Sequence, residues 1–232
     1  MGQQAIPRPS GQRECVMISI FNHTRLAAAA ATAIILAGGA TVGAVGSKPS
    51  STEFNLFPNK AFQNCLAAPG RTPTAEVEVK RGEANDRLTL KVRNLKPDLD
   101  FDVFTVEKTP QLADGTANPN FGGNFGFAWY QSDLHTNHRG EGEITLKTVL
   151  LDQIFGFDAS RGVTPVNTFN LGFWFNNPAD ASDCGFTGST PFNGEHQAGP
   201  LAMITRLDAT TKLGPLCTDP QSNNDGTFHC NP

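Results

Sequence analysis

Two neighbouring segments alternate strictly between apolar and polar residues, and this period of two constrains the fold more than any other feature of the sequence. The segments are TAEVEVKR (74–81) and DRLTLKVRNL (86–95), and they are joined through GEAND. Successive side chains of a β-strand point to opposite faces, so this pattern predicts strands with one buried face. We therefore expect a β-hairpin whose core-facing residues are Val77, Val79, Leu88, Leu90 and Val92.

The segment LDFDVFTVEK (99–108) changes phase partway along its length. Leu99, Phe101 and Val103 share one face, whereas Phe104 and Val106 take the other. Such a change predicts either a β-bulge or a strand that is covered on both faces.

Further strand candidates are separated by clusters of Gly, Pro, Asn and Asp. The candidates are 124–131, 142–151, 168–175 and 200–207. One short segment, LLDQIFGFD (150–158), is the only helical candidate. Short strands, long turn-rich loops and almost no helical periodicity predict an all-β fold, an antiparallel β-sandwich with long loops. We expect residues 218–232 to form an irregular tail.

The first 46 residues have the pattern of a leader and signal peptide. Arg25 precedes an uncharged run rich in Ala and Gly from Leu26 to Gly46, and cleavage is expected after Ala44 or Gly46. The run is long enough to be a membrane anchor, but its weakly apolar composition and the lack of a basic cluster after it favour a cleaved signal. The expected product is residues 47–232, a single secreted β-sandwich domain with no stable membrane span.

The secreted domain is acidic. Without the leader it keeps 15 basic and 21 acidic residues, a net charge of −6. An acidic surface repels phosphate backbones, so we expect no nucleic-acid partner. About 186 residues are enough for one domain with a sizeable core.

The cysteine count becomes even when Cys15 leaves with the leader. The four that remain are Cys65, Cys184, Cys217 and Cys230. In an exported chain they predict two disulfides, for which three pairings are possible. We favour a short tail loop closed by Cys217 and Cys230, and a long-range link between Cys65 and Cys184. No CxxC spacing occurs, which argues against structural zinc.

Three histidines are the candidate metal ligands. His135 and His138 lie in LHTNHRGEGEITLK (134–147), and His196 lies in a later loop beside Glu195. The glycines before the alternating residues 143–147 favour a strand, a tight turn and another strand. The pair is then most simply interpreted as solvated turn histidines, with a metal-dependent hydrolase as the alternative.

Other catalytic patterns are weak. Ser189 lacks the setting of a nucleophile elbow, and Asp133 with Glu141 or Glu143 is only weak support for glycoside hydrolysis. The segment from Gln221 fails the EF-hand pattern because Pro232 stands where the bidentate Glu would be, and an Asn-Asp-Gly turn explains it better. We expect a protein that is not an enzyme and has no cofactor.

The aromatic residues suggest a binding surface. Seventeen of the twenty are Phe, which is usually buried, whereas Trp and Tyr favour sites that are half exposed to water. If any surface of the domain binds a ligand, we expect it where Trp129, Tyr130 and Trp174 come together, and a glycan or small-ligand binder is an alternative function. For Trp174 itself, packing against a neighbouring loop is the favoured interpretation and an exposed binding patch is the alternative.

The segment LTLKVRNLKPDLDFDVFTVEK (88–108), followed by HTNHRGEGEITLK (135–147), resembles bacterial exported immunoglobulin-like sandwiches. The domain as a whole is most similar to uncharacterised secreted proteins of actinobacteria, in which an Ala-rich leader precedes a β domain rich in Phe, Gly and Asn. This resemblance implies export and fold but carries no functional residues. We expect a secreted, non-catalytic binding protein with an unknown extracellular or cell-envelope partner.

Overall fold

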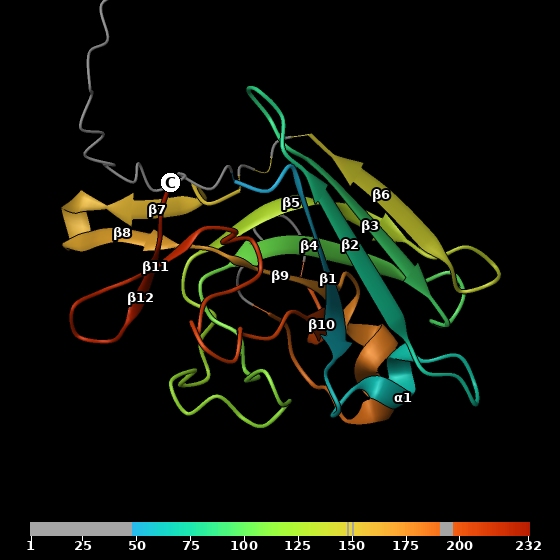
Figure 1. The fold of residues 1–232 in the computed structure, drawn as a ribbon. Helices are drawn as coiled ribbons and strands as arrows, with labels where there is room; N and C mark the ends of the chain where they lie inside the picture. Colours follow the sequence, from blue (N-terminus) through green and yellow to red (C-terminus); the bar gives the residue numbers. More distant parts are fainter. Residues whose placement is uncertain (1–47, 148, 150, 191–196) are drawn as a thin grey trace, which may run out of the picture. The chain divides into compact units, whose positions relative to one another are not determined.

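Eight strands form one antiparallel sheet, which makes the fold all-β (Figure 1). The computed structural model describes residues 48–147, 149, 151–190 and 197–232. Across the sheet the strands are β5 (Ala128–His135), β4 (Asp100–Val106), β9 (Asn170–Phe175), β10 (Leu201–Ile204), β1 (Ser51–Pro58), β2 (Thr74–Lys80), β3 (Arg87–Arg93) and β6 (Gly142–Leu146).

Four short strands and three short helices complete the secondary structure of the described residues. The strands form two hairpins, β7 (Phe155–Asp158) with β8 (Val163–Asn167) and β11 (Pro220–Ser222) with β12 (Phe228–Cys230). The helices are α1 (Gln63–Leu66) and the 3-10 helices η1 (Ala159–Arg161) and η2 (Pro178–Cys184).

The hairpin predicted from the alternating segments is confirmed. Strands β2 and β3 pair antiparallel, with Val77 opposite Leu90. All five apolar residues expected to face the core are buried, and they belong to the main hydrophobic cluster of the domain. The period of two in the sequence therefore identified both strands and their inner face.

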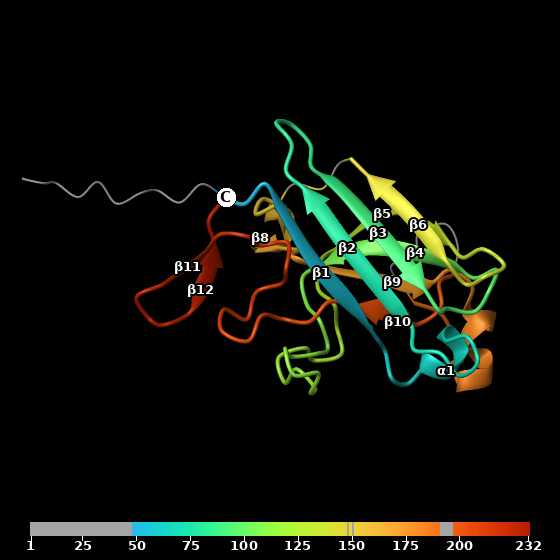
Figure 2. The same ribbon diagram turned by 45° about the vertical axis from the view of Figure 1, so that its right-hand side comes forward.

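Strand β1 joins the two halves of the sheet. Residues Ser51–Leu56 pair with β2, whereas Phe57 and Pro58 pair with β10. Figure 2 shows β1 running beside β2 and ending next to β10. The two end strands, β5 and β6, lie close together without a β-ladder between them. The β-sandwich is therefore a single sheet that folds over its core and is nearly closed into a barrel.

Strand β4 is covered on both faces, as its phase change predicted. Phe101 and Val103 lie in the main cluster, whereas Phe104 and Val106 lie in a second, smaller cluster together with Trp174. The β4–β5 register also shifts between Val103 and Phe104, so a bulge is present as well.

Several element predictions need correction. The helix expected at 150–158 is not formed by the described residues 151–158, because Phe155–Asp158 pair with β8, a partner that no local pattern reveals. The strand expected at 124–131 begins only at Ala128, since the Asn124 side chain accepts a hydrogen bond from Gly126 N and turns the chain. The tail is not irregular throughout, because it contains the β11–β12 hairpin with the predicted turn at Gly226.

The two disulfides have the pairing favoured from the sequence. Cys65 in α1 bonds to Cys184 in η2, across 119 positions of the chain. Cys217 bonds to Cys230 in β12, across 13 positions. The first bridge joins the β1–β2 connection to the β9–β10 connection, and the second closes a loop in the C-terminal segment, so each bridge restrains long connecting segments.

The described part of the chain contains no helix long and apolar enough to span a membrane. The predicted leader, including the apolar run 26–46 and Cys15, lies outside the described residues. Residues Gly46–Pro232 cluster as one compact unit.

Shortening a buried side chain of β3 or of β9 in the main core should destabilise the domain. Leu90→Ala and Phe173→Ala each remove a fully buried side chain and are expected to lower the free energy of unfolding by about 3 kcal/mol, measured by urea denaturation. Lys91→Ala, on the exposed face of β3, is the control and should change it by less than about 0.5 kcal/mol. A neutral result at both core positions would mean that the strand faces are wrongly assigned.

The long-range disulfide should contribute more stability than the short one. Loop-closure entropy grows with the length of the closed loop, so we expect about 3 kcal/mol from Cys217–Cys230 and about 4 to 5 kcal/mol from Cys65–Cys184. The paired variants Cys217→Ser/Cys230→Ser and Cys65→Ser/Cys184→Ser test this order by thermal unfolding. An unchanged melting temperature under strong reductant would show that neither bridge stabilises the fold.

Candidate functional site

A groove of about 350 Å³ runs beside the edge strand β5. Its described lining contains aromatic, aliphatic and amide side chains but no charged one, and consists of Trp129, Tyr130, Gln131, Val149, Gln153, Ile154 and Phe155. Large apolar side chains are exposed on both sides of it, since Trp129 is 46% and Phe155 51% exposed. Concave, mostly apolar surfaces with a few placed polar groups are typical of ligand sites.

A β-bulge builds the β5 side of the groove. Val103 pairs with Ser132 and Phe104 with Tyr130, which leaves Gln131 as an extra residue in the strand. In a regular strand consecutive side chains point to opposite faces, yet three consecutive residues of β5 line this groove. Bulges commonly redirect a side chain beside a functional site.

Two buried aspartates hold the opposite wall in place. The Asp86 carboxylate accepts hydrogen bonds from the backbone N–H groups of Leu151 and Gly82. The backbone N–H of Asp152 donates a hydrogen bond to Leu216 O at 3.0 Å. Two residues further along the chain, Ile154 O accepts a hydrogen bond from Thr168 N at 2.8 Å. The wall is therefore fixed at several points along its length before any ligand arrives.

The Asp152 side chain is fully buried and is held by several donors. Its carboxylate accepts hydrogen bonds from Arg81 Nη2 at 2.8 Å and from the backbone and hydroxyl of Thr218. Lys48 Nζ lies 3.6 Å from the same carboxylate. A buried carboxylate is tolerated only when it is paired and hydrogen-bonded, so these contacts explain its position.

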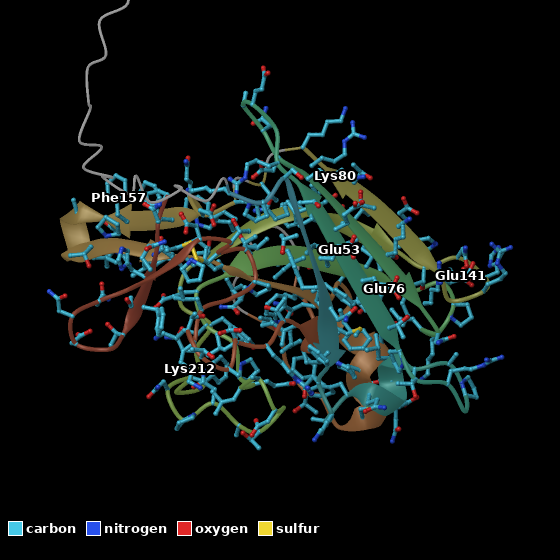
Figure 3. The ribbon with its side chains drawn as sticks, viewed as in Figure 1. Glu53, Glu76, Lys80, Glu141, Phe157 and Lys212 are labelled. Carbon is cyan, nitrogen blue, oxygen red and sulfur yellow. A yellow bond between two sulfur atoms is a disulfide. The ribbon has the colours of Figure 1, made fainter. Side chains whose placement is uncertain are left out.

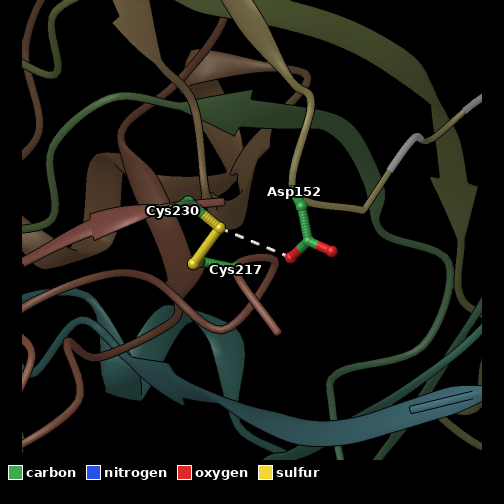
Figure 4. Close-up of side chains that lie close together, drawn as sticks. All are labelled: Asp152, Cys217 and Cys230. Carbon is green, nitrogen blue, oxygen red and sulfur yellow. Dashed lines mark hydrogen bonds between the residues drawn. A yellow bond between two sulfur atoms is a disulfide. The ribbon is translucent and has the colours of Figure 1, made fainter. Parts of the chain in front are cut away.

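Asp152 also lies against the Cys217–Cys230 disulfide (Figure 4). These three residues form the only group of at least three His, Cys, Asp or Glu ligands, within the ranges described, whose atoms are close enough to share a metal ion. The sulfurs are bonded to each other, however, and metal binding needs thiolates. Cys230 Sγ is 3.4 Å from Asp152 Oδ1 and carries no proton to donate, so this arrangement is structural.

The indole of Trp129 lies close to Gly156 in strand β7 of the β7–β8 hairpin. A Cβ atom added to Gly156 would be 2.9 Å from Trp129 Cζ2 and 3.2 Å from Phe127 Cδ1. Only glycine leaves enough room for the ring at this position. Phe157, the next residue of β7, is 63% exposed and is not among the lining residues of the groove. Figure 3 shows it on the hairpin.

The three aromatic residues singled out from the sequence do not form one surface. Tyr130 is exposed beside Trp129, but Trp174 is only 1% exposed. Its ring packs edge-on against Phe104 and against Phe125 of the 107–127 loop. The interpretation that Trp174 packs against a neighbouring loop is therefore right, and its assignment to an exposed binding patch is wrong.

His135 and His138 occupy the end of β5 and the turn that follows it. His135 Nδ1 is 2.8 Å from Asp100 Oδ1, and His138 Nδ1 is 3.0 Å from Asp98 Oδ1. All four side chains are exposed, and each imidazole faces a different aspartate. Neither histidine belongs to a three-ligand group among the residues that the structure describes, and His196 lies outside them.

The acidic residues considered for glycoside hydrolysis all have surface partners. Asp133 accepts a hydrogen bond from the Tyr130 hydroxyl at 2.8 Å. Glu141 pairs with Arg139, and Glu143 lies 3.8 Å from Lys91. These contacts give the three carboxylates ordinary roles on the sheet surface and its turn.

Comparison of the chain with protein-family models, curated proteins and solved structures found no match. Sequence reasoning selected Trp129 and Tyr130 but missed Gln131, Gln153 and Phe155. The phase change at Val103 reflects the burial of β4 on both faces, and no local pattern indicated the extra residue in β5. Nothing local indicated that residues 149 and 151–155 would lie opposite β5 either.

The single tyrosine of the chain should titrate at unusually high pH. Partial burial, the hydrogen bond to Asp133 and the negative charges of Asp133 and Asp102 raise the pKa of Tyr130 to about 12. The folded protein therefore favours the neutral phenol, and this contribution to stability is complete below pH 10 and is lost as pH rises toward 12. Ultraviolet titration of the phenolate should show a midpoint near pH 12.

Asp133→Asn tests the cause of this shift. The variant removes a negative charge and should lower the midpoint without returning it fully to 10, because burial is the largest contribution. A wild-type midpoint near 10 would contradict the arrangement around Tyr130.

Proposed function

We propose that this protein is an exported, non-catalytic binding protein that binds its ligand in the groove between β5 and the wall formed by Val149 and residues 153–155. The supporting observation is the pair of half-exposed rings, Trp129 and Phe155, on a groove whose walls are fixed by backbone and carboxylate contacts. Exposed aromatic side chains in a concave site supply large contact area at small cost in side-chain entropy. A preorganised wall lowers the cost of binding further.

Export is part of the proposal. Residues 1–46 serve as leader and signal peptide, and the mature domain acts outside the cell or in the cell envelope. Two disulfides support this location because such bonds persist in oxidising compartments. The immunoglobulin-like character of the sandwich and the likeness to secreted actinobacterial proteins belong to the same proposal.

Among the described residues, no contact favours the alternative function, a metal-dependent hydrolase. His135 and His138 are each engaged with an aspartate of β4 or of the residues just before it.

The two tryptophans allow a direct test of binding in the groove. In a Trp174→Phe variant, the remaining emission comes from Trp129 and should be strongly quenched by acrylamide, whereas in Trp129→Phe the buried Trp174 should resist quenching. A panel of cello-, xylo- and chito-oligosaccharides and uncharged Val- and Leu-rich peptides is then added to the first variant. At least one probe should protect Trp129 from quenching, and protection by none would remove the groove as a binding site.

A further inference from the structure

The chemistry of the groove lining indicates the kind of ligand that it accepts. Its described part carries no formal charge, although the chain as a whole is acidic. Tyr130 is neutral over the whole physiological range, and its hydroxyl donates to the Asp133 carboxylate. An anionic ligand would lose its hydration in this groove without gaining an opposite charge and would be repelled by Asp133, so the lining disfavours anions.

The lining contains two primary amides besides the Trp129 indole N–H and the Tyr130 hydroxyl, which already donates to Asp133. Gln131 lies on the bulge and Gln153 on the opposite wall, so each side of the groove has one glutamine. Each amide offers a carbonyl oxygen that accepts and an NH₂ group that donates two hydrogen bonds. Gln131 already donates one to Thr105 Oγ1 at 3.3 Å, which orients its carboxamide, and Gln153 is exposed.

Rings and amides together match one class of molecule. A pyranose ring presents a face of C–H groups that packs on an aromatic ring, while its hydroxyls both donate and accept hydrogen bonds at the periphery. An extended apolar peptide would also use the rings, and its backbone N–H and C=O groups can pair with the amides, but it presents no flat face of C–H groups for stacking on an indole. We propose that the groove binds a neutral saccharide, stacked on Trp129 and hydrogen-bonded by Gln131 and Gln153; this rests on the proposed function of the groove.

The experiment is calorimetric titration of the intact secreted domain with neutral cello-, xylo- and chito-oligosaccharides, and separately with the uncharged Val- and Leu-rich peptides. Trp129→Ala should weaken saccharide binding by at least tenfold. Gln153→Leu keeps the size of the side chain but removes its hydrogen bonds, and it should weaken saccharide binding by about tenfold, the effect of about 1.4 kcal/mol. Unchanged saccharide affinity in Gln153→Leu would contradict the hydrogen-bonding role of Gln153.

Two further variants separate loss of the site from loss of the fold. Gly156→Ala adds a methyl group 2.9 Å from the indole and should weaken saccharide binding while both tryptophans remain. Phe157→Ala removes an exposed ring outside the groove and should leave the affinity unchanged. Circular dichroism and thermal unfolding confirm that each variant is folded.

The possible failures are distinguishable. If peptides protect Trp129 and saccharides do not, the ligand class is wrong and the groove remains a binding site. If saccharides bind equally well to Trp129→Ala, their site lies elsewhere and this inference is overturned. If neither class binds, both the ligand class and the proposed function fail.

Discussion

The buried Asp152 carboxylate is the interaction on which the arrangement of the domain depends. It connects the start of the described chain at Lys48, the end of β2 through Arg81 and the C-terminal region through Thr218, and it sits beside the Cys217–Cys230 disulfide. A carboxylate taken out of water is stable only while these donors stay in place. The electrostatic requirement therefore fixes these three distant segments to the segment that contains Asp152, and residues of that segment form a wall of the groove.

The groove also depends on the double-sided burial of β4 and β9. These strands place Phe101 and Phe173 in the main core, while Phe104 and Trp174 fill the second cluster under the 107–127 loop. Because both faces are packed, the β4–β9 pair forms a rigid support for β5. The bulge at Gln131 is the one irregularity in the pairing of β5 with β4. It lies in the part of this edge strand that lines the groove.

Sequence reasoning succeeded where the decisive signal is local. The alternation in 74–81 and 86–95 identified β2 and β3 with their inner faces, and the even cysteine count led to the two disulfides. It failed at Phe155–Asp158 and at the tail because four- and three-residue strands contain too few residues to establish a period. Of the candidate site, it identified the aromatic side of β5 but not the wall that faces it.

The all-β class, the buried faces of the long strands and the two disulfides can all be inferred from the sequence, because each has a local pattern or a residue count behind it. The exposure of Trp129 and Trp174, in contrast, depends on the tertiary structure. Both lie in strands among aromatic neighbours, yet Phe125 of a loop distant in sequence covers Trp174, whereas Trp129 on the edge strand remains half exposed. Burial depends on which segments the topology brings together, and no periodicity along a single segment contains that information.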